Sequence, residues 1–204
     1  MADNIKTAAT LFLITLISGL LLGAVYGMTK DPIDKANNAA LYAAYEALVP
    51  GSTDYQKADD AAVQKINADI TADGSYGKVT VNSVVTAADK SGNTLGYIVD
   101  VTGHEGYNGD IELTVGYTEQ DGKLASTGIS YLSLAETPGL GMRAQEPEFQ
   151  DQFVGKSTDK LTVTKSGNAG ETEINAMSGA TITSNAVTNA VSAANYAVSS
   201  SVQQ

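Results

Sequence analysis

The sequence has no cysteine and no tryptophan, and its 204 residues include one histidine (His104) and one arginine (Arg143). Without cysteine there is no thiol nucleophile, no thiolate-bound iron–sulfur cluster, no cysteine zinc site and no disulfide. With one histidine, a multi-histidine metal centre would need several copies of the chain, and a Ser–His–Asp triad could form only through His104. The chemistry must come from carboxylates, hydroxyls, the backbone or a cofactor. The sequence predicts no catalytic residue and no metal site.

Positive charge is also scarce. The chain has 12 Lys and Arg residues against 23 Asp and Glu, which gives a net charge of −11 and a pI near 4.3. This balance excludes sequence-independent binding of nucleic acid, which requires a basic surface that neutralises phosphates. A hydrophobic fraction of 43% with 17% charged residues fits a globular core with an acidic, solvated surface.

One long apolar run, Ala8–Met28, stands near the N-terminus and carries no charge. At about 1.5 Å per residue, a helix of this length spans about 31 Å, close to the ~30 Å hydrocarbon core of a bilayer. A cleaved signal peptide would have a shorter apolar stretch and a more basic start, and a buried soluble helix would rarely be apolar all round. We therefore predict a retained single-span anchor and a place in the cell membrane. Lys6 before the run and Lys30 and Lys35 after it leave its orientation open.

Two helical patterns follow the apolar run. Lys30-Asp31-Pro32 is expected to end the first helix, because proline cannot continue a helix interior. Ile33–Val49 then has an apolar stripe of helical period that stops at Pro50-Gly51. Asp59–Ile70 has a weaker pattern of the same kind, so the region after the anchor is predicted to be helical.

From Lys78 onwards the apolar period changes to two, which is typical of strands. The runs are Lys78–Ala87, Leu95–Thr102, Asp110–Tyr117 and Lys123–Leu134. Because the turns between them are short, the four strands should form an antiparallel meander.

The remaining patterns predict a short helix over Glu146–Val154, a short strand over Lys160–Lys165 and a final helix from about Ser184. The expected fold is α+β: a single N-terminal transmembrane helix followed by an antiparallel sheet with flanking helices. The expected divisions are an anchor (1–30), a helical segment (31–76) and a main domain (77–204).

The most informative segment is Ser178-Gly179-Ala180-Thr181-Ile182-Thr183, directly before the last predicted helix. Hydroxyl residues at a helix start commonly act as caps for backbone N–H groups, and the residues alone leave this explanation open. The same N–H groups and the positive end of the helix dipole also suit a phosphate. Gly179 and Ala180 would let the backbone approach a bulky ligand.

SGATIT resembles the flavin-attachment motif of the FMN-binding domain in RnfG, a component of the Rnf complex, and in its relative NqrC, a component of the Nqr complex. The resemblance implies FMN attached by a phosphoester to the last threonine, Thr183 here, with Thr181 as the alternative. Residues 136–143 (ETPGLGMR) look like the family's flavin-lining segment, and residues 106–109 (GYNG) are similar to its upstream glycine–aromatic turn. The cofactor-binding residues implied are Thr183, Ser178, Gly179, Ala180, Thr181, Glu136, Thr137, Gly139, Leu140 and Gly141.

The residues of these segments also have a physical interpretation. A threonine hydroxyl is a weak nucleophile and no obvious base stands near it in the sequence, so self-attachment is not expected. The resemblance implies a separate ApbE-type, Mg-dependent flavin transferase that acts on FAD. Leu140 could pack on the flavin ring, and Glu136 could bond a polar group of the flavin or serve as a turn carboxylate. Arg143 could pair with the flavin or with a surface carboxylate, whereas a lone His104 is expected to be structural.

The resemblance implies a membrane-anchored electron-transfer subunit of an ion-translocating ferredoxin:NAD oxidoreductase, assembled with other Rnf membrane subunits. Its soluble domain would lie outside the cytoplasm, and the protein would not be catalytic alone. No dinucleotide fingerprint of the G-x-G-x-x-G type follows a strand, so NAD is not expected to bind here. The alternatives are a role like that of NqrC in a quinone reductase, a stand-alone anchored flavoprotein for extracellular electron transfer, and a non-redox domain in which SGATIT is only a cap.

Overall fold

The computed structural model describes residues 2–202, with side chains described from residue 11 onwards except at 24, 27, 28 and 30–38. The chain divides into two compact units, Met1–Tyr42 and Ala43–Gln204. Helix α1 (Ala2–Leu48) begins in the first unit and ends in the second. The prediction that a helix ends at Pro32 is wrong, because α1 continues through this residue. A proline removes one helical hydrogen bond, and the alanine- and leucine-rich sequences on both sides favour helix.

The expected span, Ala8–Met28, lies within α1, and its side chains at 8–10, 24, 27 and 28 lie outside the described residues. Large apolar side chains of the described part are exposed, among them Leu11 (59%), Phe12 (67%) and Leu22 (72%). Among the described residues, no helix has an apolar stretch long enough to cross a membrane.

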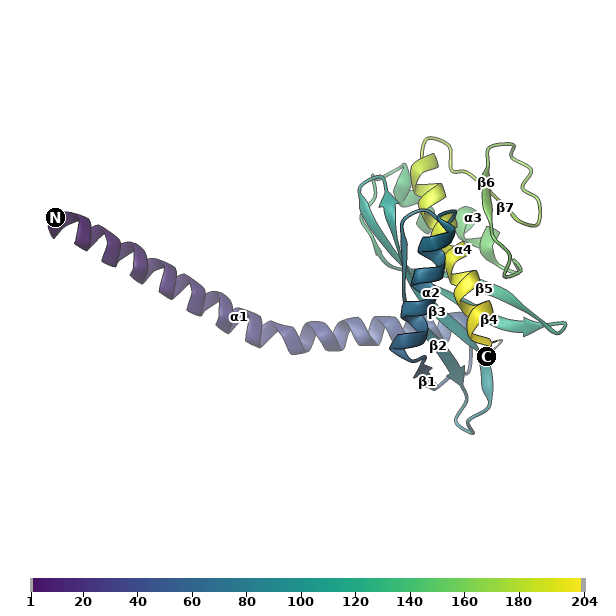
Figure 1. The fold of residues 1–204 in the computed structure, drawn as a ribbon, viewed down its shortest axis with the longest axis horizontal. Helices are drawn as coiled ribbons and strands as arrows, with labels where there is room; N and C mark the ends of the chain where they lie inside the picture. The colour runs from purple at the N-terminus through teal and green to yellow at the C-terminus, as the bar shows by residue number, and fades with distance from the viewer. Residues whose placement is uncertain (1, 203–204) are drawn as a thin grey trace. The chain divides into compact units, whose positions relative to one another are not determined.

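A five-stranded antiparallel sheet forms the centre of the second unit (Figure 1). The strands follow one another in chain order: β1 (Asp54–Lys57), β2 (Val79–Ala88), β3 (Thr94–Gly106), β4 (Gly109–Gln120) and β5 (Lys123–Leu134). Strands β2 to β5 confirm the predicted meander and the α+β class. Strand β1 was not predicted, because its residues Asp-Tyr-Gln-Lys are mostly exposed and show no apolar alternation.

Two helices cover one face of the sheet (Figure 1). Helix α2 (Asp60–Asp73) packs on β2, and α4 (Thr181–Val202) lies beside it across β2 and β3. Helix α4 buries alanine and valine side chains along most of its length. These small side chains allow a close approach, so that a Cβ added at Gly103 would lie 3.1 Å from the carbonyl oxygen of Ala186. The core between α4 and the strands fixes the position of the first turn of α4, where the site described below lies.

The opposite face of the sheet is covered by the end of α1. Side chains alternate along a strand, so Asp100 of β3 points away from α4 and toward this face. The hydroxyl of Tyr45 donates a hydrogen bond to the Asp100 carboxylate, which also accepts from Ser83 at 2.6 Å and Thr114 at 2.7 Å. Because Asp100 is 6% exposed, these three hydroxyls replace its water and connect α1 to β2, β3 and β4.

We expect Tyr45→Phe to lower the free energy of unfolding by about 1.5–3 kcal/mol, because a hydrogen bond to a charged group contributes about that much. A urea titration followed by circular dichroism measures the change. Tyr107→Phe is the control, since the Tyr107 side chain is 68% exposed and should not alter the midpoint. Equal midpoints for the two variants would show that the buried carboxylate does not depend on Tyr45.

Short elements connect β5 to α4. They include the predicted short helix, which forms as α3 and a 3-10 turn, and the predicted short strand, which forms as β6. Strand β7 was not predicted, because three residues are too few to show a period. The elements are two 3-10 turns (Gly141–Gln145 and Asp151–Phe153), α3 (Pro147–Gln150) and a parallel pair of strands, β6 (Thr162–Thr164) and β7 (Glu173–Asn175).

Candidate functional site

A cavity of about 400 Å³ lies at the first turn of α4, where three separate segments meet. The segments are the turn between β3 and β4, the loop after β5, and the loop that leads into α4. The residues that line it are Tyr107, Glu136, Thr137, Leu140, Gly141, Gly179, Ala180, Thr181, Ile182 and Thr183. The fold therefore brings together the three sequence segments GYNG, ETPGLG and SGATIT, and we call this space the Thr183 cavity.

Most of the residues predicted to bind a cofactor line the Thr183 cavity, and only Ser178 and Gly139 do not. Gly139 has a φ of +75°, so glycine is needed there for the turn of the loop. Ile182 and Tyr107 line the cavity but were not among the predicted site residues. The signal that could have identified them is a large apolar or aromatic side chain inside a glycine-rich motif, and both are exposed (53% and 68%).

Thr183 and Glu136 are the buried polar side chains of the cavity, with exposed fractions of 1% and 5%. The Thr183 hydroxyl donates a hydrogen bond to Oε2 of Glu136 at 3.2 Å. Oε1 of the same carboxylate accepts from the backbone N–H of Asn108 at 3.2 Å. The sequence shows no obvious base near the threonine hydroxyl, and the structure places the Glu136 carboxylate beside it. The two residues are 47 positions apart, and only the packing of α4 against the loop after β5 brings them together.

Ser184 supports the loop that leads into α4. Its hydroxyl donates to the carbonyl of Ala180 at 2.9 Å and accepts from the backbone N–H of Met177 at 3.0 Å.

Gly179, in the same loop, has a φ of +78°, a conformation that strains other residues. Since α4 begins at Thr181 and not at the predicted Ser184, Thr183 lies in its first turn. The N–H groups of a first turn have no partner within the helix and form the positive end of its dipole, an arrangement that suits an anion.

Two glycines make room for the Glu136 carboxylate. A Cβ at Gly141 would lie 2.5 Å from Oε2 of Glu136 and 2.7 Å from the hydroxyl oxygen of Thr183. A Cβ at Gly106 would lie 2.8 Å from Oε1. Real Cβ atoms essentially never make contacts this short, so a side chain at either glycine would force the carboxylate or its neighbours to shift.

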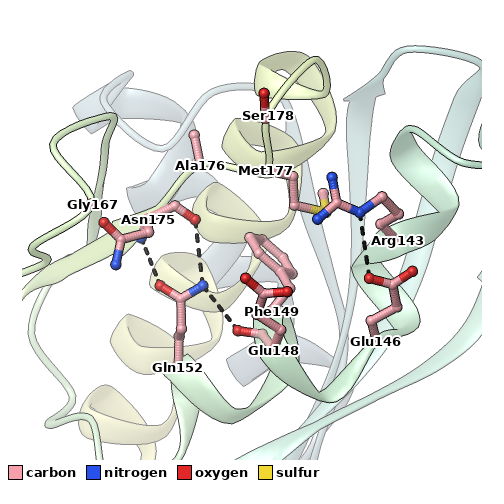
Figure 2. A pocket seen from close by; sticks show the side chains of 10 residues that line it. All are labelled: Arg143, Glu146, Glu148, Phe149, Gln152, Gly167, Asn175, Ala176, Met177 and Ser178. Atoms are coloured by element: carbon pink, nitrogen blue, oxygen red, sulfur yellow. Dashed lines mark hydrogen bonds and ion pairs between the residues drawn. The ribbon is translucent and has the colours of Figure 1, made fainter.

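A second cavity, of about 300 Å³, lies beside α3 and contains more charge (Figure 2). Figure 2 shows Arg143 paired with Glu146, with an Nε–Oε2 distance of 3.4 Å, so the arginine has a surface carboxylate as its partner. Gln152 accepts from the backbone N–H of Asn175 at 2.7 Å and so connects the end of β7 to the 3-10 turn after α3. The residues lining this cavity are Arg143, Glu146, Glu148, Phe149, Gln152, Gly167, Asn175, Ala176, Met177 and Ser178.

His104 lies outside both cavities. Its Nδ1 is 3.1 Å from a carboxylate oxygen of Asp110, and its Nε2 is 2.9 Å from the hydroxyl of Thr80. These contacts between neighbouring strands agree with the structural role expected for it.

Comparison with known protein families identifies the part of the chain that contains the Thr183 cavity. The FMN-binding domain family matches residues 106–195, a range that contains every residue lining the Thr183 cavity. The chain is 31% identical over 188 residues to the G subunit of the Na(+)-translocating ferredoxin:NAD(+) oxidoreductase complex of Acetobacterium woodii, covering 91% of this chain and 87% of that one. It is 35% identical over 175 residues to the G subunit of the proton-translocating ferredoxin:NAD(+) oxidoreductase complex of Clostridium ljungdahlii, covering 86% and 80%.

A similarity over a shorter part of the chain is found to a subunit of another complex. It is 34% identical over 147 residues to the C subunit of the Na(+)-translocating NADH-quinone reductase of Vibrio anguillarum, covering 66% of this chain and 55% of that one.

Proposed function

The chain belongs to the RnfG family of ion-translocating oxidoreductase complexes, and from this membership we propose that it passes electrons through FMN bound covalently to Thr183. Relatives of this family are named as subunits of ferredoxin:NAD(+) oxidoreductases. The chain is accordingly one part of an oxidoreductase, with ferredoxin and NAD as the two ends of its electron path.

The position of Thr183 carries the proposal. Its side chain lines a cavity at the start of a long helix, within the range that matches the FMN-binding domain. A phosphate esterified at this place would lie against the N–H groups of the first turn, where the helix dipole favours negative charge.

The remaining lining residues fit a flavin. A volume of about 400 Å³ lies in the range usual for small-molecule sites, about 300–1,000 Å³. Leu140, Ala180 and Ile182 offer apolar surface for a flat ring, and glycine at 141 and 179 leaves the space free of side chains. The second cavity contains Arg143 and two glutamates, which suit an apolar ring less well.

FMN supplies the redox chemistry when it is bound, and the protein supplies its position and surroundings. Leu140 and Ile182, which are 44% and 53% exposed, would cover the ring and exclude water from it. Tyr107, which also lines the cavity, would offer an aromatic surface to the bound flavin. A covalent bond to Thr183 would prevent loss of the cofactor on a side of the membrane where FMN is not replaced.

Helix α1 is proposed to anchor the chain in the membrane through its apolar part, with the second unit outside the cytoplasm. The exposed leucine, isoleucine and phenylalanine side chains between Leu11 and Val25 support this proposal, because an apolar surface of this kind needs a lipid or protein environment. The proposed partners are the other membrane subunits of the complex and, during assembly, an ApbE-type flavin transferase.

The Nqr-like alternative has less support. The chain covers 55% of the Vibrio anguillarum quinone reductase protein, against 87% and 80% of the two ferredoxin:NAD(+) oxidoreductase proteins. Purification distinguishes membership of the complex from the alternative of a stand-alone anchored flavoprotein. If the chain is part of the complex, other Rnf subunits should copurify with the tagged chain.

The mass of the intact chain tests covalent attachment. Production together with an ApbE-type transferase and FAD should add the mass of FMN less one water, and omission of the transferase should add nothing. Trypsin should place the added mass on residues 166–204, because Lys165 is the last Lys or Arg in the sequence. Fragmentation of that peptide should then locate it at Thr183. An unchanged mass with an active transferase would refute the proposed function.

A further inference from the structure

The hydroxyl that would carry the flavin is already hydrogen-bonded to a carboxylate. Thr183 donates to Oε2 of Glu136 at 3.2 Å, and both side chains are almost fully buried. A threonine hydroxyl becomes an effective nucleophile only when a neighbouring group accepts its proton. The contact therefore has the arrangement of a nucleophile and its base.

The carboxylate is oriented by a third group, as in other activated nucleophiles. Its Oε1 accepts from the backbone N–H of Asn108, whose side-chain amide donates to the carbonyl of Ala135 at 2.7 Å. Gly106 lies close to Oε1 and Gly141 lies close to Oε2, at distances that leave no room for a Cβ on either residue. These contacts direct the second oxygen, Oε2, at Thr183.

No other carboxylate and no histidine lines the Thr183 cavity among the described residues. His104 contacts Asp110 and Thr80, and Arg143 contacts Glu146 in the second cavity. Within the part of the chain that the structure describes, Glu136 is thus the proton acceptor available to the Thr183 hydroxyl.

We propose that Glu136 is the general base of flavin attachment and that this chain activates its own acceptor hydroxyl. The inference rests on the proposed attachment of FMN to Thr183. The Thr183 oxygen forms a bond to the FMN-side phosphorus of FAD, the bond from that phosphorus to the bridging oxygen breaks, and AMP leaves. The hydroxyl proton moves to Oε2 of Glu136. No oxidation or reduction occurs in this step.

The proton transfer also removes the repulsion between the Glu136 carboxylate and the phosphate of the attached flavin. After attachment, a phosphodiester anion would lie next to Glu136 in a buried site, where two adjacent negative charges repel strongly. A protonated Glu136 is neutral and can donate a hydrogen bond to a phosphate oxygen. The same group that activates the hydroxyl thus becomes compatible with the product.

The test measures the single-turnover rate of flavin attachment with purified transferase and FAD, read from the intact mass and in-gel fluorescence of the full chain. Glu136→Gln keeps the size of the side chain but cannot accept the proton, so the rate should fall about 10²-fold or more. The chain concentration that gives half the maximal rate should stay unchanged. Glu146→Gln is the matched control, since this carboxylate is 53% exposed, and it should react at the wild-type rate.

A second variant separates proton transfer from a role in folding. Glu136→Ala leaves a space at the carboxylate, and added formate should raise its rate of attachment in proportion to concentration. Attachment to Glu136→Gln at the wild-type rate, or a Glu136→Ala rate that formate does not change, would overturn the inference. The proposed function fails separately, if the wild-type chain takes up no flavin.

Discussion

Replacing Thr183 with valine is expected to abolish covalent flavin, so that the intact mass stays that of the bare chain after full reaction with transferase and FAD. Valine has nearly the shape of threonine, and a methyl group takes the place of the hydroxyl. The first turn of α4 should keep its packing, because Thr183 is 1% exposed and valine tolerates burial. The nucleophilic oxygen is lost, and no phosphoester can form.

Thr181→Val is the matched control. Thr181 lines the same cavity two residues earlier, and the hydrogen bond to Glu136 comes from Thr183. This variant should therefore take up FMN as the wild type does. The opposite pattern, with flavin on Thr183→Val and none on Thr181→Val, would move the attachment to Thr181. Circular dichroism of both variants is needed, because valine at 183 removes one donor from a buried carboxylate, at a cost of about 1–3 kcal/mol.

The sheet was predictable from the sequence because β2 to β5 have long runs of period two separated by glycine-containing turns. Strand β1 could not be predicted, because its own residues are mostly polar and exposed and only its pairing with β2 defines it as a strand. The continuation of α1 through Pro32 was also missed. A single proline argues against helix locally, but the residues on both sides determine whether the helix resumes.

The site was predictable as a set of segments and not as a set of contacts. Resemblance brought SGATIT, ETPGLG and GYNG together, and the fold places all three around one cavity. The hydrogen bond from Thr183 to Glu136 joins residues on different elements, and no local spacing indicates it. The structure also shows which hydroxyl supports the start of α4, the role that the helix-cap explanation gave to the residues of the motif. Ser184, one residue beyond the motif, bonds the Ala180 carbonyl and the Met177 N–H, while the Thr183 hydroxyl turns to the carboxylate.

Gly141→Ala is expected to reduce the rate of flavin attachment by about 10²-fold while leaving the fold intact. The added Cβ would meet Oε2 of Glu136 at 2.5 Å and the Thr183 oxygen at 2.7 Å, so one or both must move. A displacement of about 1 Å between reacting groups can cost about 10²-fold in rate. Overpacking should also lower the free energy of unfolding by about 1–3 kcal/mol, which a urea titration measures.

Gly170→Ala makes the same chemical change where there is room for it. Its Cβ would lie 3.4 Å from Oε2 of Glu173, an ordinary contact, and neither Gly170 nor Gly141 has the left-handed backbone that strains alanine. The two variants therefore differ in what the new methyl group touches, and Gly170→Ala should accept FMN at the wild-type rate. If folded Gly141→Ala accepted flavin equally fast, the close contact between Thr183 and Glu136 would not be needed for attachment. If it accepted flavin slowly at a wild-type half-saturating concentration, the defect would lie in the reaction of the Thr183 hydroxyl and not in recognition by the transferase.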